Sequence, residues 1–232
     1  MTNIENNIKE FIKGKGKNLG RNSNERYASF DYCFNYFQQF KENNRVKEII
    51  SEINLQQSCL QLGFYLASWG MLRGSSFLLE KSARVYSKLL KEIVGFDKNI
   101  WDIDVDSYTE ENIDLILGCK ERIINSFGNK SQKNWDTLTT KIMLGIFANV
   151  PAFDENFKRF LKRTTICQTF NKKSLLGIKE FYDKDSNKKI INKYSKKIHS
   201  YDFLSGKETN RNYTKAKIID MIGFIDGQKN KI

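Results

Sequence analysis

Proline occurs only once in this chain of 232 residues, at position 151. Proline has no backbone N–H and disrupts helix interiors, so a chain almost without it can run through long helices. Apolar side chains also recur every three or four residues, as in Tyr27, Phe30, Phe34 and Phe37, which places them on one helical face. With 40% hydrophobic residues the chain can bury a real core. We predict an all-α fold of about eight helices in a single compact domain.

The most apolar stretch is Leu60–Ser76, with the sequence LQLGFYLASWGMLRGSS. Its apolar residues cover every side of a helical wheel, and such a helix is normally buried on all sides. The 13 residues from Leu60 to Leu72 are too few to cross a bilayer, which needs about 20. We therefore predict a buried central helix near residues 55–72 and no membrane span. Gly63, Ala67, Gly70 and Gly74 would let a second helix approach closely.

The chain divides into three parts by composition. Residues 1–26 are predicted to form an amphipathic helix and a basic, glycine-rich linker, residues 27–150 a helical core, and residues 151–232 a basic helical part packed on the same core. The linker Gly14–Arg21 has neither the preceding strand nor the Gly-Lys-Ser/Thr ending of a phosphate-binding loop. It is interpreted as a mobile linker or as an arm that contacts nucleic acid.

The four cysteines predict a reducing environment. Cys33, Cys59, Cys119 and Cys167 are isolated, with no Cys-x-x-Cys pair and no secretory leader before them. Free thiols are typical of cytosolic proteins, so we predict a cytoplasmic location.

Positive charge is concentrated in the last third of the chain. The net charge is +12; residues 1–150 hold 20 Lys/Arg and 18 Asp/Glu, net +2, whereas residues 151–232 hold 19 and 9, net +10. Such a basic surface attracts polyanions, above all nucleic acid. The predicted phosphate contacts are Arg159, Arg163, Lys172, Lys173, Lys188, Lys189, Lys193, Lys196 and Lys197. The alternative is lysine drift on solvated helix faces, because the chain has 30 Lys against 9 Arg.

Several common kinds of site are excluded by residue types. His199 is the only histidine, and no Cys or His pair has zinc-site spacing. Asp102, Asp104 and Asp106 resemble the opening of a calcium-binding loop, but the required glycine is Ser107 and the closing glutamate is Ile113. No metal or other cofactor is predicted.

A second hypothesis is an enzyme or nucleotide-binding protein built on the turn Arg73-Gly74-Ser75-Ser76. Small residues before a new helix leave backbone N–H groups free, and the adjacent guanidinium would assist anion binding. The candidate ligand residues lie in or beside the apolar helices: Trp69, Arg73, Ser75, Ser76, Lys141, Asp154 and Asp220. A serine-capped interhelical turn, and Asp154 at a helix N-terminus, would explain the same residues structurally. A third hypothesis is an interaction module for an acidic protein partner.

Three segments resemble a group of uncharacterised bacterial proteins of similar length. They are Leu62–Ser76 (LGFYLASWGMLRGSS), Leu138–Phe157 (LTTKIMLGIFANVPAFDENF) and Thr214–Met221 (TKAKIIDM). Where these proteins tend to have Gly-Cys before Val-Pro, this chain has Ala148-Asn149. The resemblance implies a stand-alone bacterial protein, and it supplies neither an activity nor catalytic residues.

Overall fold

The computed structural model describes residues 3–16, 19–74, 76–128 and 135–230. These residues form one predominantly helical domain, which confirms the all-α prediction. The α-helices are α1 (Ile4–Lys13), α2 (Ala28–Glu42), α3 (Leu55–Ser68), α4 (Tyr86–Val94), α5 (Glu110–Ser126), α6 (Trp135–Phe147), α7 (Glu155–Arg163), α8 (Lys172–Asp183), α9 (Asp185–Lys197) and α10 (Lys215–Lys229). Short 3₁₀ helices are η1 (Val46–Ile50), η2 (Phe77–Glu80), η3 (Ala83–Val85), η4 (Lys98–Trp101) and η5 (Val105–Ser107).

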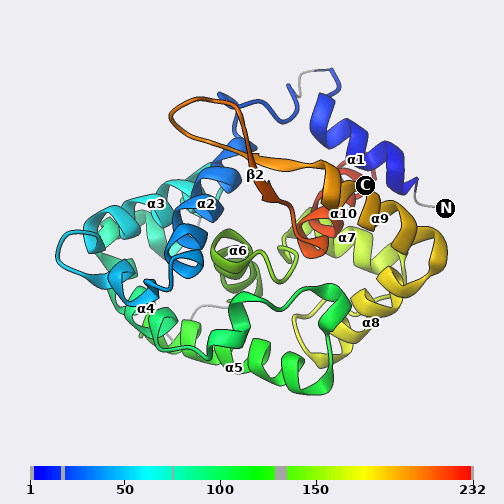
Figure 1. Cartoon of the computed structure of the whole chain (residues 1–232). Helices are drawn as coiled ribbons and strands as arrows, with labels where there is room; N and C mark the ends of the chain where they lie inside the picture. The colour runs from blue at the N-terminus through cyan, green and yellow to red at the C-terminus, as the bar shows by residue number, and fades with distance from the viewer. Residues whose placement is uncertain (1–2, 17–18, 75, 129–134, 231–232) are drawn as a thin grey trace.

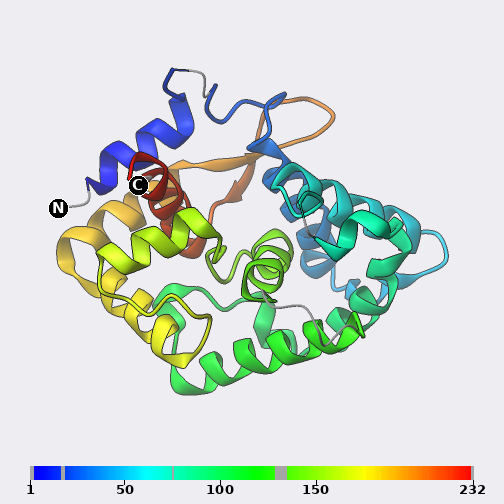
Figure 2. The same cartoon turned by 180° about the vertical axis from the view of Figure 1, so that it is seen from behind.

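The helices surround α6, which lies at the centre in both views of the chain (Figures 1 and 2). Helices α2, α3 and α4 lie on one side of α6, and α7, α8 and α9 lie on the other. No helix in the described part of the chain has the length and apolar character needed to cross a bilayer.

The predicted central helix near residues 55–72 is wrong in position. Every residue of α6 from Leu138 to Phe147 is buried, and so is every residue of α10 from Ala216 to Gly227. Helix α3 ends at Ser68 and buries only one face, leaving Leu60 46% and Phe64 68% exposed. Its neighbours α2, α4 and α6 cover that one face, so an apolar surface remains on the outside.

The small residues of α3 do not form a continuous packing stripe either. Gly63 faces the ring of Tyr86, whereas Gly70 (φ 76°) and Gly74 (φ 60°) follow the helix in left-handed backbone conformations. Such conformations favour glycine, so Gly70 ends the helix and Gly74 lies in the turn that follows.

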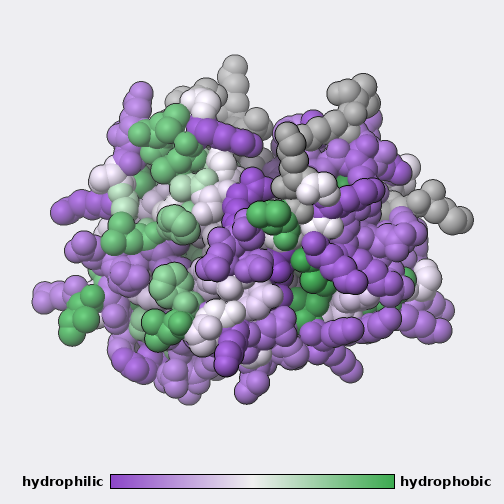
Figure 3. All heavy atoms as spheres, turned by 90° about the horizontal axis from the view of Figure 1, so that it is seen from above, coloured by the Kyte–Doolittle hydropathy of each residue, from purple (hydrophilic) through white to green (hydrophobic). Residues whose placement is uncertain are grey.

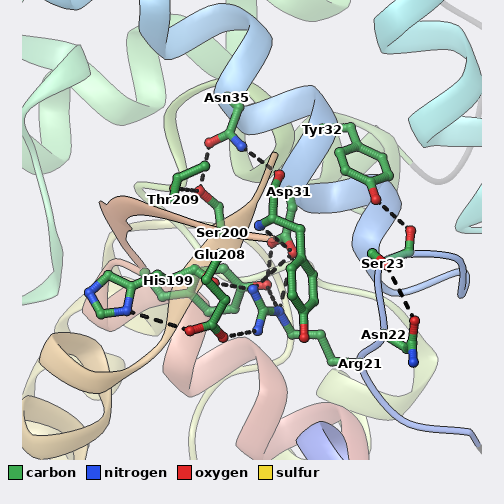
Figure 4. Close-up of polar contacts among 12 residues, drawn as sticks. Arg21, Asn22, Ser23, Asp31, Tyr32, Asn35, His199, Ser200, Glu208 and Thr209 are labelled. Carbon is green, nitrogen blue, oxygen red and sulfur yellow. Dashed lines mark hydrogen bonds and ion pairs between the residues drawn. The ribbon is translucent and has the colours of Figure 1, made fainter. Parts of the chain in front are cut away.

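The linker expected to be mobile is held in place at Arg21, which is only 6% exposed. Its guanidinium donates to Asp31 on α2, to Tyr213, to Glu208 and to the backbone oxygen of His199 (Figure 4). The last two belong to a hairpin that the sequence did not predict, formed by β1 (His199–Tyr201) and β2 (Glu208–Asn212). One buried cation therefore joins the N-terminal segment, α2 and the hairpin.

The acidic stretch around Asp104 serves the start of α10. The Asp104 carboxylate accepts hydrogen bonds from the backbone N–H groups of Lys215 (2.8 Å) and Ala216 (2.9 Å), two of the free donors in the first turn of α10. The Lys215 ammonium lies 3.2 Å from Asp106. Within the described residues, no group of three or more His, Cys, Asp or Glu side chains is placed to hold a metal ion.

Gly145 on α6 allows α3 to approach, and we expect Gly145→Ala to destabilise the fold. A methyl group there would lie 2.4 Å from the buried ring of Tyr65, so the free energy of unfolding should fall by about 1–3 kcal/mol in urea denaturation. Gly118 on α5 has no neighbouring heavy atom within 4 Å of the position that an alanine methyl group would take. Gly118→Ala is therefore the matched control and should stabilise by up to about 1 kcal/mol. Equal effects of the two substitutions would contradict the packing argument.

We expect the buried Asp31 carboxyl group to make the free energy of unfolding depend on pH between 7 and 5. Complete burial raises the pKa of Asp31 to about 6, although Arg21 and the Tyr213 hydroxyl oppose that rise. The folded chain thus binds this proton at a higher pH than the unfolded chain. As pH falls from 7 to 5, the wild type should gain on the order of 1 kcal/mol of unfolding free energy relative to Asp31→Asn. No relative change over that range would show that Arg21 keeps Asp31 ionised, because neither the folded nor the unfolded chain would then bind this proton above pH 5.

Candidate functional site

The basic residues predicted to contact phosphates lie on α7, α8 and α9, together on one side of the molecule (Figures 1 and 2). Seen from above, hydrophilic side chains dominate the side of α9, and hydrophobic ones are more frequent on the side of α2 and α3 (Figure 3). The predicted phosphate contacts are therefore grouped in space as well as in the sequence.

Five of the nine predicted contacts already have polar partners within the protein. Arg159 donates to Asn156; ion pairs join Arg163 to Asp226, Lys172 to Glu110, Lys188 to Asp183 and Lys193 to Glu5. The remaining four, Lys173, Lys189, Lys196 and Lys197, are exposed and have no ion-pair partner in the described part of the chain. Lys184, between α8 and α9, is also exposed and without an ion-pair partner in the described residues. It was missed because the sequence does not distinguish paired from unpaired lysines.

Two surface depressions flank these lysines. One, of about 580 Å³, lies between α8 and the loop that follows α7, and Lys172, Lys173 and Lys184 line it. The other, of about 470 Å³, runs along α9 and is lined by Lys188, Lys196 and Lys215 among others. One depression therefore lies beside α8 and the other beside α9, and lysines line both.

The candidate ligand residues from the sequence separate into two places. The Arg73 side chain is exposed and lies against the backbone of Gly70, and the Ser76 hydroxyl donates to the backbone oxygen of Met71 and accepts from Leu78 N–H. Ser76 thus caps η2, which agrees with the alternative prediction of a serine-capped interhelical turn. Ser75 lies outside the described residues.

The other four candidates, Trp69, Lys141, Asp154 and Asp220, come together in the interior with Lys217 and Tyr65 around one small cavity. We call Trp69, Lys141, Asp154, Lys217 and Asp220 the lysine–aspartate cluster. Lys141 is 3% exposed and Lys217 1% exposed, so both ammonium groups are buried. The three segments that carry the resemblance meet here: the first supplies Trp69, the second Lys141 and Asp154, and the third Lys217 and Asp220.

Each buried lysine is paired with one aspartate. The Lys141 Nζ lies 3.1 Å from Asp154 Oδ2, and the Lys217 Nζ lies 2.8 Å from Asp220 Oδ2. Both ammonium groups also lie 5.3 Å from the centre of the Trp69 ring. The pairing makes burial of the two cations tolerable, because a buried charge without a partner is strongly unfavourable.

The remaining carboxylate oxygens bind backbone N–H groups. Asp154 Oδ1 accepts from the N–H groups of Asn156 and Phe157 and so caps α7, as expected for a carboxylate at a helix N-terminus. Asp220 Oδ1 accepts from Ala152 N–H in the loop between α6 and α7. In that loop Ala148 has φ 53°, a conformation that favours glycine.

Tyr65 completes the cavity wall as a neutral phenol. Burial, together with the neighbouring Cys33, Asp220 and Asp154, raises the pKa of Tyr65 well above its ordinary value. This side chain and Lys217 were both missed from the sequence. Lys217 carried a usable signal, because it stands three residues before Asp220 in the largely apolar stretch 216–225.

His199 is half-buried in β1, with Nδ1 3.9 Å from a Glu208 carboxylate oxygen. It takes no part in the lysine–aspartate cluster.

No protein-family model, curated protein or solved structure matches this chain. A function must therefore be inferred from the chemistry of these two places.

We expect Lys217→Met to destabilise the protein strongly. It keeps a long apolar side chain but leaves the Asp220 carboxylate buried without its cation, which costs about 3–5 kcal/mol. The double variant Lys217→Met with Asp220→Asn should recover part of this loss in urea denaturation, because no lone charge remains. If the single and double variants were equally stable, the pairing of these two groups would not be the stabilising interaction.

Proposed function

We propose that this protein binds nucleic acid through the phosphate backbone, without sequence preference, using the exposed lysines of α8 and α9. The observation that carries the proposal is the grouping of exposed lysines on α8 and α9 and between them that have no ion-pair partner in the described residues: Lys173, Lys184, Lys189, Lys196 and Lys197. Ammonium groups that are not neutralised by the protein itself can neutralise phosphates and release the counterions bound to them.

The shape of α9 supports this proposal. Lys189, Lys193 and Lys196 follow one another at spacings of four and three residues, so they form a row on one helical face. The row is about 10 Å long at 1.5 Å per residue. Lys189 and Lys196, its two ends, are free to contact a strand, and only Lys193 is paired, with Glu5 of α1.

Lysines favour contacts to phosphate over recognition of bases. An ammonium group is a compact point charge, whereas bidentate reading of a guanine edge is best made by arginine. Both arginines among the predicted contacts, Arg159 and Arg163, are engaged within the protein. We therefore propose binding that depends on charge and salt and only weakly on sequence.

The cysteines support a reducing compartment as the place of action. All four are free thiols, and Cys33, Cys59 and Cys119 are buried in the core. We propose the cytoplasm, where nucleic acid is available as a partner.

The test is binding of labelled DNA and RNA of unrelated sequences, measured by fluorescence anisotropy across a range of salt concentrations. The triple variant Lys189→Gln, Lys196→Gln and Lys197→Gln should make the plot of log affinity against log salt concentration less steep by about 2–3. Affinity should fall by a similar factor for every nucleic-acid sequence. The matched control is Lys81→Gln, Lys88→Gln and Lys91→Gln, which removes three exposed lysines before and on α4 and should leave the slope nearly unchanged.

Equal effects of the two triple variants would contradict the proposal, because net charge alone would then explain binding. Absence of binding at low salt would also contradict it, and co-purification with an acidic protein would then favour the interaction module.

A further inference from the structure

The lysine–aspartate cluster has more hydrogen-bond donors than its protein acceptors can satisfy. Each lysine ammonium carries three N–H groups, and each of these two makes one hydrogen bond, to Asp154 or to Asp220. The indole N–H of Trp69 is buried and has no acceptor among the described residues. Buried donors without acceptors are costly. The unpartnered indole N–H and the remaining ammonium N–H groups belong to residues that line one cavity, which suits a further acceptor there.

Each of the four carboxylate oxygens in the cluster already accepts at least one hydrogen bond. Asp154 Oδ1 binds two backbone N–H groups and Asp220 Oδ1 binds one, while the Oδ2 atoms hold the two lysines. Aromatic faces supply part of what Lys217 needs, since its Nζ lies 4.3 Å from the Phe30 ring centre. They do not replace an acceptor for Lys141 or for the indole of Trp69.

The cavity admits only one small atom in this conformation. Its volume is about 10 Å³, which is about the space that one water molecule needs. The cluster is most open to solvent near Asp154, whose side chain is 19% exposed, and beside Trp69, which is partly buried at the end of α3. A ligand atom would therefore enter between these two residues.

We propose that the cluster binds a small anion, with one negatively charged acceptor atom held by Lys141, Lys217 and the Trp69 N–H. The acceptor atom is either a halide enclosed in the cavity or one oxygen of a phosphate or carboxylate that reaches in beside Trp69. This site is separate from the basic surface of α8 and α9, and it does not depend on nucleic-acid binding. The ring of Trp69 is kept in place by Tyr27, which stacks against it at 5.4 Å, so the indole N–H is a fixed donor.

The test is a titration of ¹⁵N-labelled protein with sodium chloride, sodium phosphate or sodium acetate at constant ionic strength, followed through the indole N–H resonances. The resonance of Trp69, identified by its loss in Trp69→Phe, should shift and saturate, while those of Trp101 and Trp135 serve as internal controls. Saturation by chloride identifies an enclosed halide; saturation by phosphate or acetate alone identifies one oxygen of a larger anion.

Lys141→Met should weaken the binding about tenfold or more, because it removes one charge-assisted hydrogen bond. It should still fold, since Asp154 keeps two backbone donors and partial contact with water. The α9 variant Lys189→Gln, Lys196→Gln and Lys197→Gln should keep the Trp69 response, which separates this site from the surface lysines. A Trp69 resonance that none of the three anions moves, or a response unchanged in Lys141→Met, would overturn the proposal.

Discussion

The burial of charged groups on α10 is the constraint on which the structure depends. This helix is enclosed from Ala216 to Gly227, yet it carries Lys217, Asp220 and Asp226. Each has a partner: Lys217 pairs with Asp220, Asp220 also binds Ala152 N–H, and Asp226 pairs with Arg163 of α7. Because isolated charges cannot be buried at acceptable cost, these contacts fix the positions of the α6–α7 loop and of α7 relative to α10.

Pairing of buried charges also holds the outer segments of the molecule in place. Arg21 is buried only because Asp31, Tyr213, Glu208 and the His199 carbonyl surround its guanidinium. Its pairing brings a glycine-rich segment near the N-terminus against a hairpin near the C-terminus. Asp104 extends the pattern by capping α10 from a distant part of the chain. Polar contacts between distant segments thus decide the topology, and the apolar residues supply the core around them.

Buried and exposed lysines differ in their partners in this protein. The buried lysines pair with aspartates, and their remaining N–H groups favour a ligand that offers one acceptor atom. Several exterior lysines on α8 and α9 have no match, and their free charge suits an extended polyanion. The two proposals use the same side chain in two environments. A buried ammonium selects a small, geometrically defined partner, whereas an exposed one attracts any phosphate and is weakened by salt.

The sequence by itself determined the helical class, the positions of most helices and the basic character of the last third, because proline content, apolar periodicity and charge are local properties. It also placed Asp154 at a helix start and marked Lys141 and Asp220 as polar residues within apolar helices. Tertiary structure decided which helices are central. They are α6 and α10 and not the predicted helix near residues 55–72, because burial depends on neighbouring elements and not on composition alone. It also decided which lysines are paired and that Lys217 and Tyr65 join the cluster, since these contacts link residues far apart in the chain.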